Sequence, residues 1–187
     1  MYSAIHVQDG RLLFDPDAYL PRHDVLYRSP ARKPYDGLAL GGGRFGGLLW
    51  QTERSLEFSL NHTDAVDFGP DGVFKAWAWE SEEENTAPFS LGRLSLCAAA
   101  PIFGWPYLTA FEQRLRLAQA AVEGCARTPF SQIKYRAFTP DGRDALVINV
   151  EARFEEATPL TLRLEKWATP NFFHHYEQIR RPGVCRG

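Results

Sequence analysis

The strongest structural signal is the stretch Gly37-Leu-Ala-Leu-Gly-Gly-Gly-Arg-Phe-Gly-Gly-Leu-Leu-Trp50, followed by Ser55-Leu-Glu-Phe-Ser-Leu-Asn-His-Thr-Asp64-Ala-Val-Asp67. A glycine cluster leads into the apolar run Phe45–Trp50, as expected of a strand that another backbone approaches closely. Residues Ser55–Leu60 then alternate, with leucine and phenylalanine on one face and glutamate and serine on the other. Because the link Gln51–Arg54 is short and polar, the pattern predicts a β-hairpin.

Alternating runs recur along the rest of the chain, and turns rich in glycine and proline separate them. The runs are Arg93–Cys97, Phe111–Leu117, Ser131–Phe138, Ala145–Phe154 and Leu160–Glu165, with the turn Thr139-Pro-Asp-Gly-Arg143 before the fourth. This spacing is typical of an antiparallel β-sandwich, so we predict an all-β fold. Helical spacing is an alternative over Leu115–Val122, since alanine and glutamine favour helices.

The pattern divides the chain into three parts. Residues 1–36 contain prolines that keep the possible strands Leu12–Phe14 and Val25–Tyr27 short, and we expect an irregular, extended lead-in that lies along the domain. Residues 37–167 are the predicted β-sandwich domain. Residues 168–187 have no strand periodicity, and we interpret them as the tail of a truncated chain or of one module of a longer protein.

Composition excludes several classes of function. A net charge of −2 gives no electrostatic footprint for nucleic acid or for an anionic membrane. The N-terminus lacks a secretory signal, and no apolar run is long enough to span a membrane, so the sequence as written predicts a cytoplasmic protein unless its true start lies upstream. Cys97, Cys125 and Cys185 form no C-x-x-C pair, which favours buried free thiols over disulfides or zinc. We expect no metal and no cofactor.

The segment Gly41-Gly-Gly43-Arg-Phe-Gly46 matches the G-x-G-x-x-G pattern of dinucleotide-binding proteins. That motif works because its glycines precede a helix whose N-terminus holds a pyrophosphate. Here a second strand pattern follows, and no helix. The context therefore favours glycines that start a strand tightly and admit a neighbouring backbone.

The most polar cluster at a strand end comprises Asn61, His62, Thr63, Asp64 and Asp67. One histidine and two carboxylates are a poor ligand set for a metal. A glycosidase would need two carboxylates that flank one bond, and the sequence does not give the distance between these two. Asx-type caps of a turn are the commonest use of such residues, and a wall of a groove or domain interface is the main alternative.

Four aromatic residues, Trp77, Trp79, Trp105 and Tyr107, are candidates for stacking against sugar rings. Packing in the core or between sheets is the commoner use of such side chains.

The glycine-rich opening and the strand that follows it resemble the N-terminal domain of glycoside hydrolase family 95-like proteins, which include α-L-fucosidases. The match consists of Gly37–Trp50, Leu60-Asn-His-Thr-Asp64, Leu91–Leu96, Phe111–Leu117 with the alanine-rich strand that follows it, and Tyr135–Phe138, in the family's order. The chain departs from the family at Ala39 (often Pro), at Gly42 (usually Asn) and at Ala65–Val66, where the family has a tryptophan-containing ending.

This resemblance implies a large antiparallel super-β-sandwich, here incomplete, that packs on an (α/α) barrel. In the family, carboxylates of the barrel hydrolyse α-L-fucosides or related sugars, and no residue of this chain aligns with the barrel. We therefore expect a scaffold module without catalytic residues, whose partners are the barrel domain of the same longer chain and a carbohydrate. The alternatives are a freestanding carbohydrate-binding or assembly module and, third, a self-sufficient enzyme that uses Asp64 and Asp67, so the sequence leaves open whether the chain is an enzyme.

Overall fold

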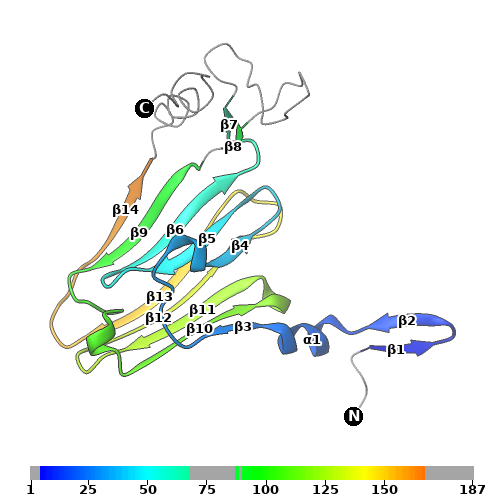
Figure 1. The fold of residues 1–187 in the computed structure, drawn as a ribbon, viewed down its shortest axis with the longest axis horizontal. Coiled ribbons are helices and arrows are strands. Elements are labelled where there is room, and N and C mark those ends of the chain that lie inside the picture. Colours follow the sequence, from blue (N-terminus) through cyan, green and yellow to red (C-terminus); the bar gives the residue numbers. More distant parts are fainter. Residues whose placement is uncertain (1–4, 68–86, 89, 167–187) are drawn as a thin grey trace, which may run out of the picture.

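Two five-stranded antiparallel sheets face each other in the computed structural model, which describes residues 5–67, 87–88 and 90–166 (Figure 1). Sheet 1 has the order β14-β9-β6-β5-β4, and sheet 2 has the order β13-β12-β11-β10-β3. The prediction of an all-β antiparallel sandwich is confirmed. Sheet 1 consists of β4 (Leu38–Gly41), β5 (Phe45–Gln51), β6 (Ser55–His62), β9 (Gly92–Ala98) and β14 (Leu160–Glu165). Sheet 2 consists of β3 (Val25–Tyr27), β10 (Ala110–Arg116), β11 (Ala121–Arg127), β12 (Ser131–Phe138) and β13 (Val147–Phe154).

The predicted hairpin is confirmed as β5 and β6, with Leu49 opposite Phe58 and Gln51 opposite Leu56. A third strand, β4, precedes it and pairs with β5. The glycine cluster forms the turn between β4 and β5, so the G-x-G-x-x-G match leads into a strand and not into a helix.

The later strands also follow the sequence pattern, except around Ala120. The helical alternative over Leu115–Val122 is wrong, because only the single 3-10 turn η4 (Leu117–Gln119) forms there. Ala120 then adopts a left-handed backbone with φ of 45°, and β11 runs back between β10 and β12. Pairing on both sides of β11 overrides the helix propensity of its alanines.

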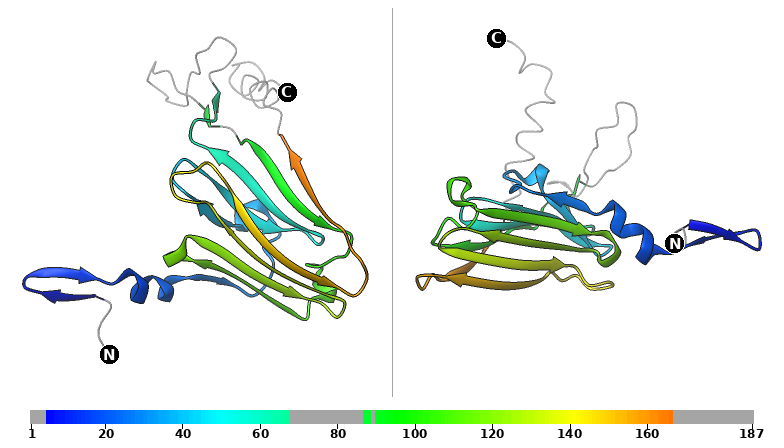
Figure 2. Two further views of the ribbon diagram at one scale, coloured as in Figure 1. Left: turned by 180° about the vertical axis from the view of Figure 1, so that it is seen from behind. Right: turned by 90° about the horizontal axis from the view of Figure 1, so that it is seen from below.

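The N-terminal residues differ from the expected lead-in along the domain. Strands β1 (Ile5–Gln8) and β2 (Arg11–Phe14) form a separate hairpin that projects away from the sandwich (Figures 1 and 2). Three short helices follow in this region, α1 (Pro16–Tyr19), η1 (Leu20–His23) and η2 (Pro34–Asp36). Strand β3 pairs with β10, so one strand of sheet 2 lies before Gly37, where we expected the domain to begin.

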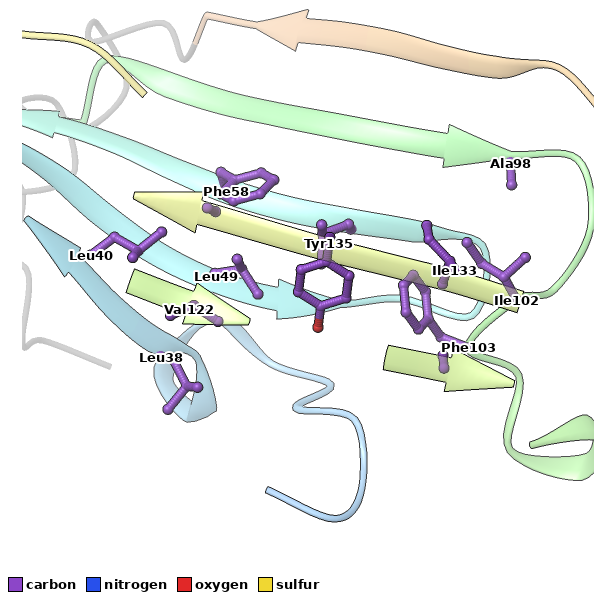
Figure 3. Close-up of a cluster of buried hydrophobic side chains, with 13 residues drawn as sticks. Leu38, Leu40, Leu49, Phe58, Ala98, Ile102, Phe103, Val122, Ile133 and Tyr135 are labelled. Carbon is purple, nitrogen blue, oxygen red and sulfur yellow. The ribbon is translucent and has the colours of Figure 1, made fainter. Parts of the chain in front are cut away.

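The core lies between the inner faces of the two sheets (Figure 3). Leu49 and Phe58 of sheet 1 meet Val122 and Ile133 of sheet 2, and all four are almost completely buried. Phe103, in the link between β9 and β10, fills one end of the core and is 0% exposed. At roughly 1.5–3 kcal/mol for each such side chain, this burial is the main contribution to stability.

A polar contact joins the two sheets inside this core. The Gln51 amide donates to the hydroxyl of Tyr135 over 3.1 Å, and its oxygen accepts the N–H of Ala31 over 3.0 Å. Burial raises the pKa of Tyr135 far above its usual value, although the hydrogen bond from Gln51 opposes this shift. The phenol therefore stays neutral in the folded protein, since the interior disfavours its charged form.

Tyr135 is expected to make the fold sensitive to alkali. The unfolded chain releases this proton near pH ~10, whereas the folded chain keeps it. The stability is thus fully present below that pH and falls above it, by about 1.4 kcal/mol per pH unit for this group. Urea unfolding between pH 8 and 11 measures the effect, and the Tyr135→Phe variant should show a shallower loss. Equal slopes for the two proteins would contradict the assignment.

Candidate functional site

The predicted polar cluster lies at one end of the sandwich, where three separate loops meet. The first is the β4–β5 turn, in which Gly42 N–H donates to the carbonyl of Phe45 over 3.0 Å and Gly43 has φ of 85°. A side chain at Gly42 would come within 3.0 Å of Thr139 Oγ1 and of the Pro140 carbonyl. Glycine at this position, where the resemblance expects asparagine, therefore lets the turn rest against the β12–β13 loop.

The second loop follows β6 and carries His62 and Asp64. The N–H of Asp64 donates to His62 Nδ1 over 3.0 Å, and the N–H of Thr63 donates to the Arg44 carbonyl over 2.9 Å. Because Nδ1 accepts a hydrogen bond, the neutral imidazole carries its proton on Nε2. The turn is thus capped by His62, a residue that the expectation of Asx-type caps did not consider.

The third loop joins β12 to β13 and brings in Asp144. The predicted turn is confirmed, with Gly142 at φ of 64° and the Arg143 N–H donating to the Pro140 carbonyl over 3.3 Å. Asp144 Oδ2 lies 3.2 Å from His62 Nε2 and 3.2 Å from Arg44 Nη2. The chain segments that meet here are far apart in sequence.

We call Arg44, His62, Asp64 and Asp144 the tip cluster. The Arg44 guanidinium reaches both carboxylates, with Nη1 3.3 Å from Asp64 Oδ2. His62 is the buried member, with 15% of its side chain exposed, whereas Arg44 and Asp64 are 64% and 67% exposed. Exposed ion pairs contribute little stability, about 0–1 kcal/mol each, so the tip cluster adds little to the stability of the fold.

The chemistry open to the tip cluster is limited by its surroundings. The cavity beside it, lined by strands β4, β5 and β6 and by Thr139 and Leu146, has a volume of about 10 Å³. Pockets that enclose small ligands are much larger, roughly 300–1,000 Å³. Among the described residues, no group of three or more histidine, cysteine, aspartate and glutamate side chains could hold a metal ion.

The remaining predicted residues are only partly accounted for. Asn61 and Thr63 are exposed beside the tip cluster, and Asp67 lies in β7 (Val66–Asp67), which pairs with β8 (Ala87–Pro88). Trp105 and Tyr107, in η3 (Trp105–Tyr107), are 67% and 49% exposed, so they do not pack in the core. Trp77 and Trp79 lie outside the residues that the structure describes.

A second polar network, on the outer face of sheet 1, was not predicted. The Glu57 carboxylate is buried and accepts hydrogen bonds from the hydroxyls of Ser55 and Ser95, the latter over 2.5 Å. Arg93 Nε lies 3.6 Å from Glu57 and donates to Glu165 over 3.1 Å. This bond to Arg93 is the main cause that lowers the pKa of Glu165, and it raises the pKa of Arg93 in turn.

Two of the cysteines lie within the described residues. Cys97 and Cys125 are free, as predicted, but they are partly exposed and not fully buried. Desolvation and the nearby Glu57 charge raise the pKa of the Cys97 thiol, which disfavours the reactive thiolate. Cys185 lies outside the described part of the chain.

None of the helices within the described residues is long and apolar enough to cross a membrane. Comparison with known proteins finds no family model that matches this sequence and no curated protein with significant similarity to it. A function therefore has to rest on the fold and on the arrangement of the side chains that the structure describes.

Proposed function

We propose that this chain is the N-terminal β-sandwich module of a fucosidase-like glycoside hydrolase and that it scaffolds a catalytic (α/α) barrel in a longer protein. The observation that carries the proposal is where the resembling segments lie. Gly37–Trp50 and Leu60–Asp64 occupy adjacent strands of sheet 1, and both contribute side chains to the tip cluster. Three of the four residues of the tip cluster, Arg44, His62 and Asp64, thus lie in the segments that suggest the family.

The positions of the two carboxylates agree with a tip cluster that contacts another domain and does not catalyse hydrolysis. Asp64 and Asp144 bind the same guanidinium, and a glycosidase needs two carboxyl groups on opposite sides of a sugar bond. The tip cluster has one guanidinium, one imidazole and two carboxylates on an open surface. Such mixed charges, at the rim of an interface, determine orientation and choice of partner.

The test begins with the genomic DNA that follows the codon for Gly187. We expect a barrel-coding sequence there, either in frame or separated by a frameshift. The barrel is then produced as a separate protein, and its binding to this chain is measured by isothermal titration calorimetry. The Arg44→Glu variant should bind at least tenfold more weakly, whereas the control Arg22→Glu, in η1, should bind as the unaltered chain does.

Activity measurements complete the test. The chain alone is expected to show no hydrolysis of an aryl α-L-fucoside. Turnover by the chain that disappears in Asp64→Asn would show instead that the module is itself the enzyme. A downstream sequence without a barrel would favour a freestanding module.

A freestanding carbohydrate-binding module is the second candidate, and the exposure of Trp105 and Tyr107 favours it. Exposed aromatic faces can stack on sugar rings. Titration of the chain with fucosylated oligosaccharides, followed by tryptophan fluorescence, distinguishes the two functions. Saturable binding that is lost in Trp105→Ala would support this candidate over the scaffold.

A further inference from the structure

One apolar stripe of the sandwich has no cover among the described residues. Leu160, Leu162 and Leu164 alternate along β14 and therefore point to the same face of sheet 1. Leu162 and Leu164 are 63% and 68% exposed, and Leu160 is 37% exposed. Large exposed leucines in a row differ from the scattered apolar residues that any surface carries.

The stripe lies beside the apolar residues of the core, at the edge of sheet 1 that sheet 2 does not cover. Leu162 pairs with Leu96 of β9, and Leu164 pairs with Leu94. Residues directly opposite each other in an antiparallel pair share a face, and both β9 leucines pack against the core. The inner face of sheet 1 is thus apolar as far as its last strand, whereas the cover from sheet 2 ends before β14.

The backbone of β14 is also open on one side. In sheet 1 this strand pairs only with β9, so its other edge has no partner strand among residues 5–67, 87–88 and 90–166. Proteins usually blunt such an edge with inward-pointing charges, bulges or prolines. Here Pro159 precedes the strand, and the positions that face inward are leucines. The edge is therefore a template for another strand.

We propose that a second copy of this chain covers this edge, by antiparallel pairing of the two β14 strands about a twofold axis at Leu164. In this register Arg163 lies opposite Glu165 of the second copy, and Glu165 lies opposite Arg163 of the second copy. Leu164 meets its own equivalent on the axis. Leu162 lies opposite Lys166 of the second copy, whose methylene stem covers apolar surface while its charge remains in water.

The charges of β14 favour this register over its neighbours. Arg163 Nη2 lies 2.5 Å from Glu165 Oε1 in the same strand, and the other Glu165 oxygen binds Arg93 of β9, so both side chains lie over the outer face of sheet 1. The Arg163 side chain is 67% exposed and therefore free to reach a second carboxylate. A twofold axis at Arg163 would place two guanidinium groups opposite each other, which is destabilising. An axis at Leu162 would place Arg163 opposite Thr161 and would form no ion pair. Only the axis at Leu164 forms two ion pairs between the copies.

Sedimentation equilibrium of the purified chain, over a range of concentrations, tests whether the copies associate. We expect the mass to rise with concentration from 21.2 kDa toward twice that value. Leu164→Lys would place two ammonium groups together on the axis and should leave a monomer at every concentration. The matched control is Leu12→Lys in β2, because Leu12 is 70% exposed and lies on another sheet. It should still form the dimer.

Circular dichroism spectra of both variants should match that of the unaltered chain, so that a loss of association is not a loss of folding. A monomeric unaltered chain at the highest concentration would overturn the proposal. So would a dimer that Leu12→Lys disrupts and Leu164→Lys does not.

Cross-linking tests the register in a chain whose three cysteines are replaced by serine. A short bis-maleimide should join two copies of Leu164→Cys efficiently, because the two thiols meet on the axis. It should join two copies of Leu160→Cys at least tenfold less, since those residues lie far from the axis. The opposite ranking would overturn the Leu164 register.

Discussion

A Gly47→Ala variant is expected to lose about 3 kcal/mol of unfolding free energy, because an added methyl group would overlap the backbone of the adjacent strand. The Cβ of alanine would lie 1.7 Å from the carbonyl oxygen of Ser59. The Ser59 hydroxyl accepts the N–H of Leu48 over 2.9 Å at this point of the hairpin, so the two strands could not separate without losing that bond as well.

Thermal unfolding followed by circular dichroism measures this loss, and a fall in Tm of roughly 6–12 °C corresponds to it for a domain of this size. The matched control is Gly41→Ala in β4, where nothing lies within 4 Å of an added Cβ. Its Tm should change by only about 1–2 °C, as for most surface substitutions. Equal effects at the two positions would mean that the close approach at Gly47 does not exist.

A Phe103→Ala variant is expected to lose about 3–5 kcal/mol of unfolding free energy, as is usual when a buried aromatic ring is removed from a core. The ring is 0% exposed and contacts Tyr135 edge-on, with 6.4 Å between the ring centroids. Its removal would leave a cavity where the β9–β10 link closes the sandwich. Urea unfolding gives the free energy directly.

Trp105→Ala is the control for Phe103→Ala, since Trp105 lies two residues further along the same link and is 67% exposed. We expect its unfolding free energy to stay within about 0.5 kcal/mol of the unaltered chain. A loss as large as that of Phe103→Ala would show that Trp105 is a packing residue, and that would also remove the argument for sugar stacking.

Strand positions could be predicted wherever apolar and polar residues alternate, so that one face of the strand is apolar. Ser131–Phe138 coincides with β12, and Leu160–Glu165 coincides with β14, because alternation with period two is a local property of the chain. Periodicity did not indicate β11, which was expected only from the resemblance, since its sequence, Ala-Val-Glu-Gly-Cys-Ala-Arg, carries a weak alternation and residues that also favour a helix. β11 is a strand because it pairs with β10 on one side and β12 on the other. These pairings cannot be read from the sequence of β11 alone.

The candidate site was predictable only in part, for a similar reason. The polar residues His62 and Asp64 stood out because they follow a clear strand. Arg44 and Asp144 did not, although each lies next to a turn that the glycines indicated. Their contact depends on how the β4–β5 turn meets the β12–β13 loop, and that contact is a property of the packed sheets.

The order of the strands in the two sheets has a consequence for how the protein folds. Strands β4, β5, β6 and β9 form one meander, and β10 to β13 form another, so most pairings in each join strands that are close in sequence. The first and last strands of the sandwich, which we call the terminal strands, are exchanged between the two meanders. β3 comes before the first meander but pairs with β10 of the second, and β14 follows the second meander but pairs with β9 of the first. Local pairings form quickly and distant ones slowly, so each meander is expected to form before either terminal strand finds its place. The exchanged strands then connect the two meanders to each other. A shortened chain that ends before β14 would still contain two nearly complete sheets.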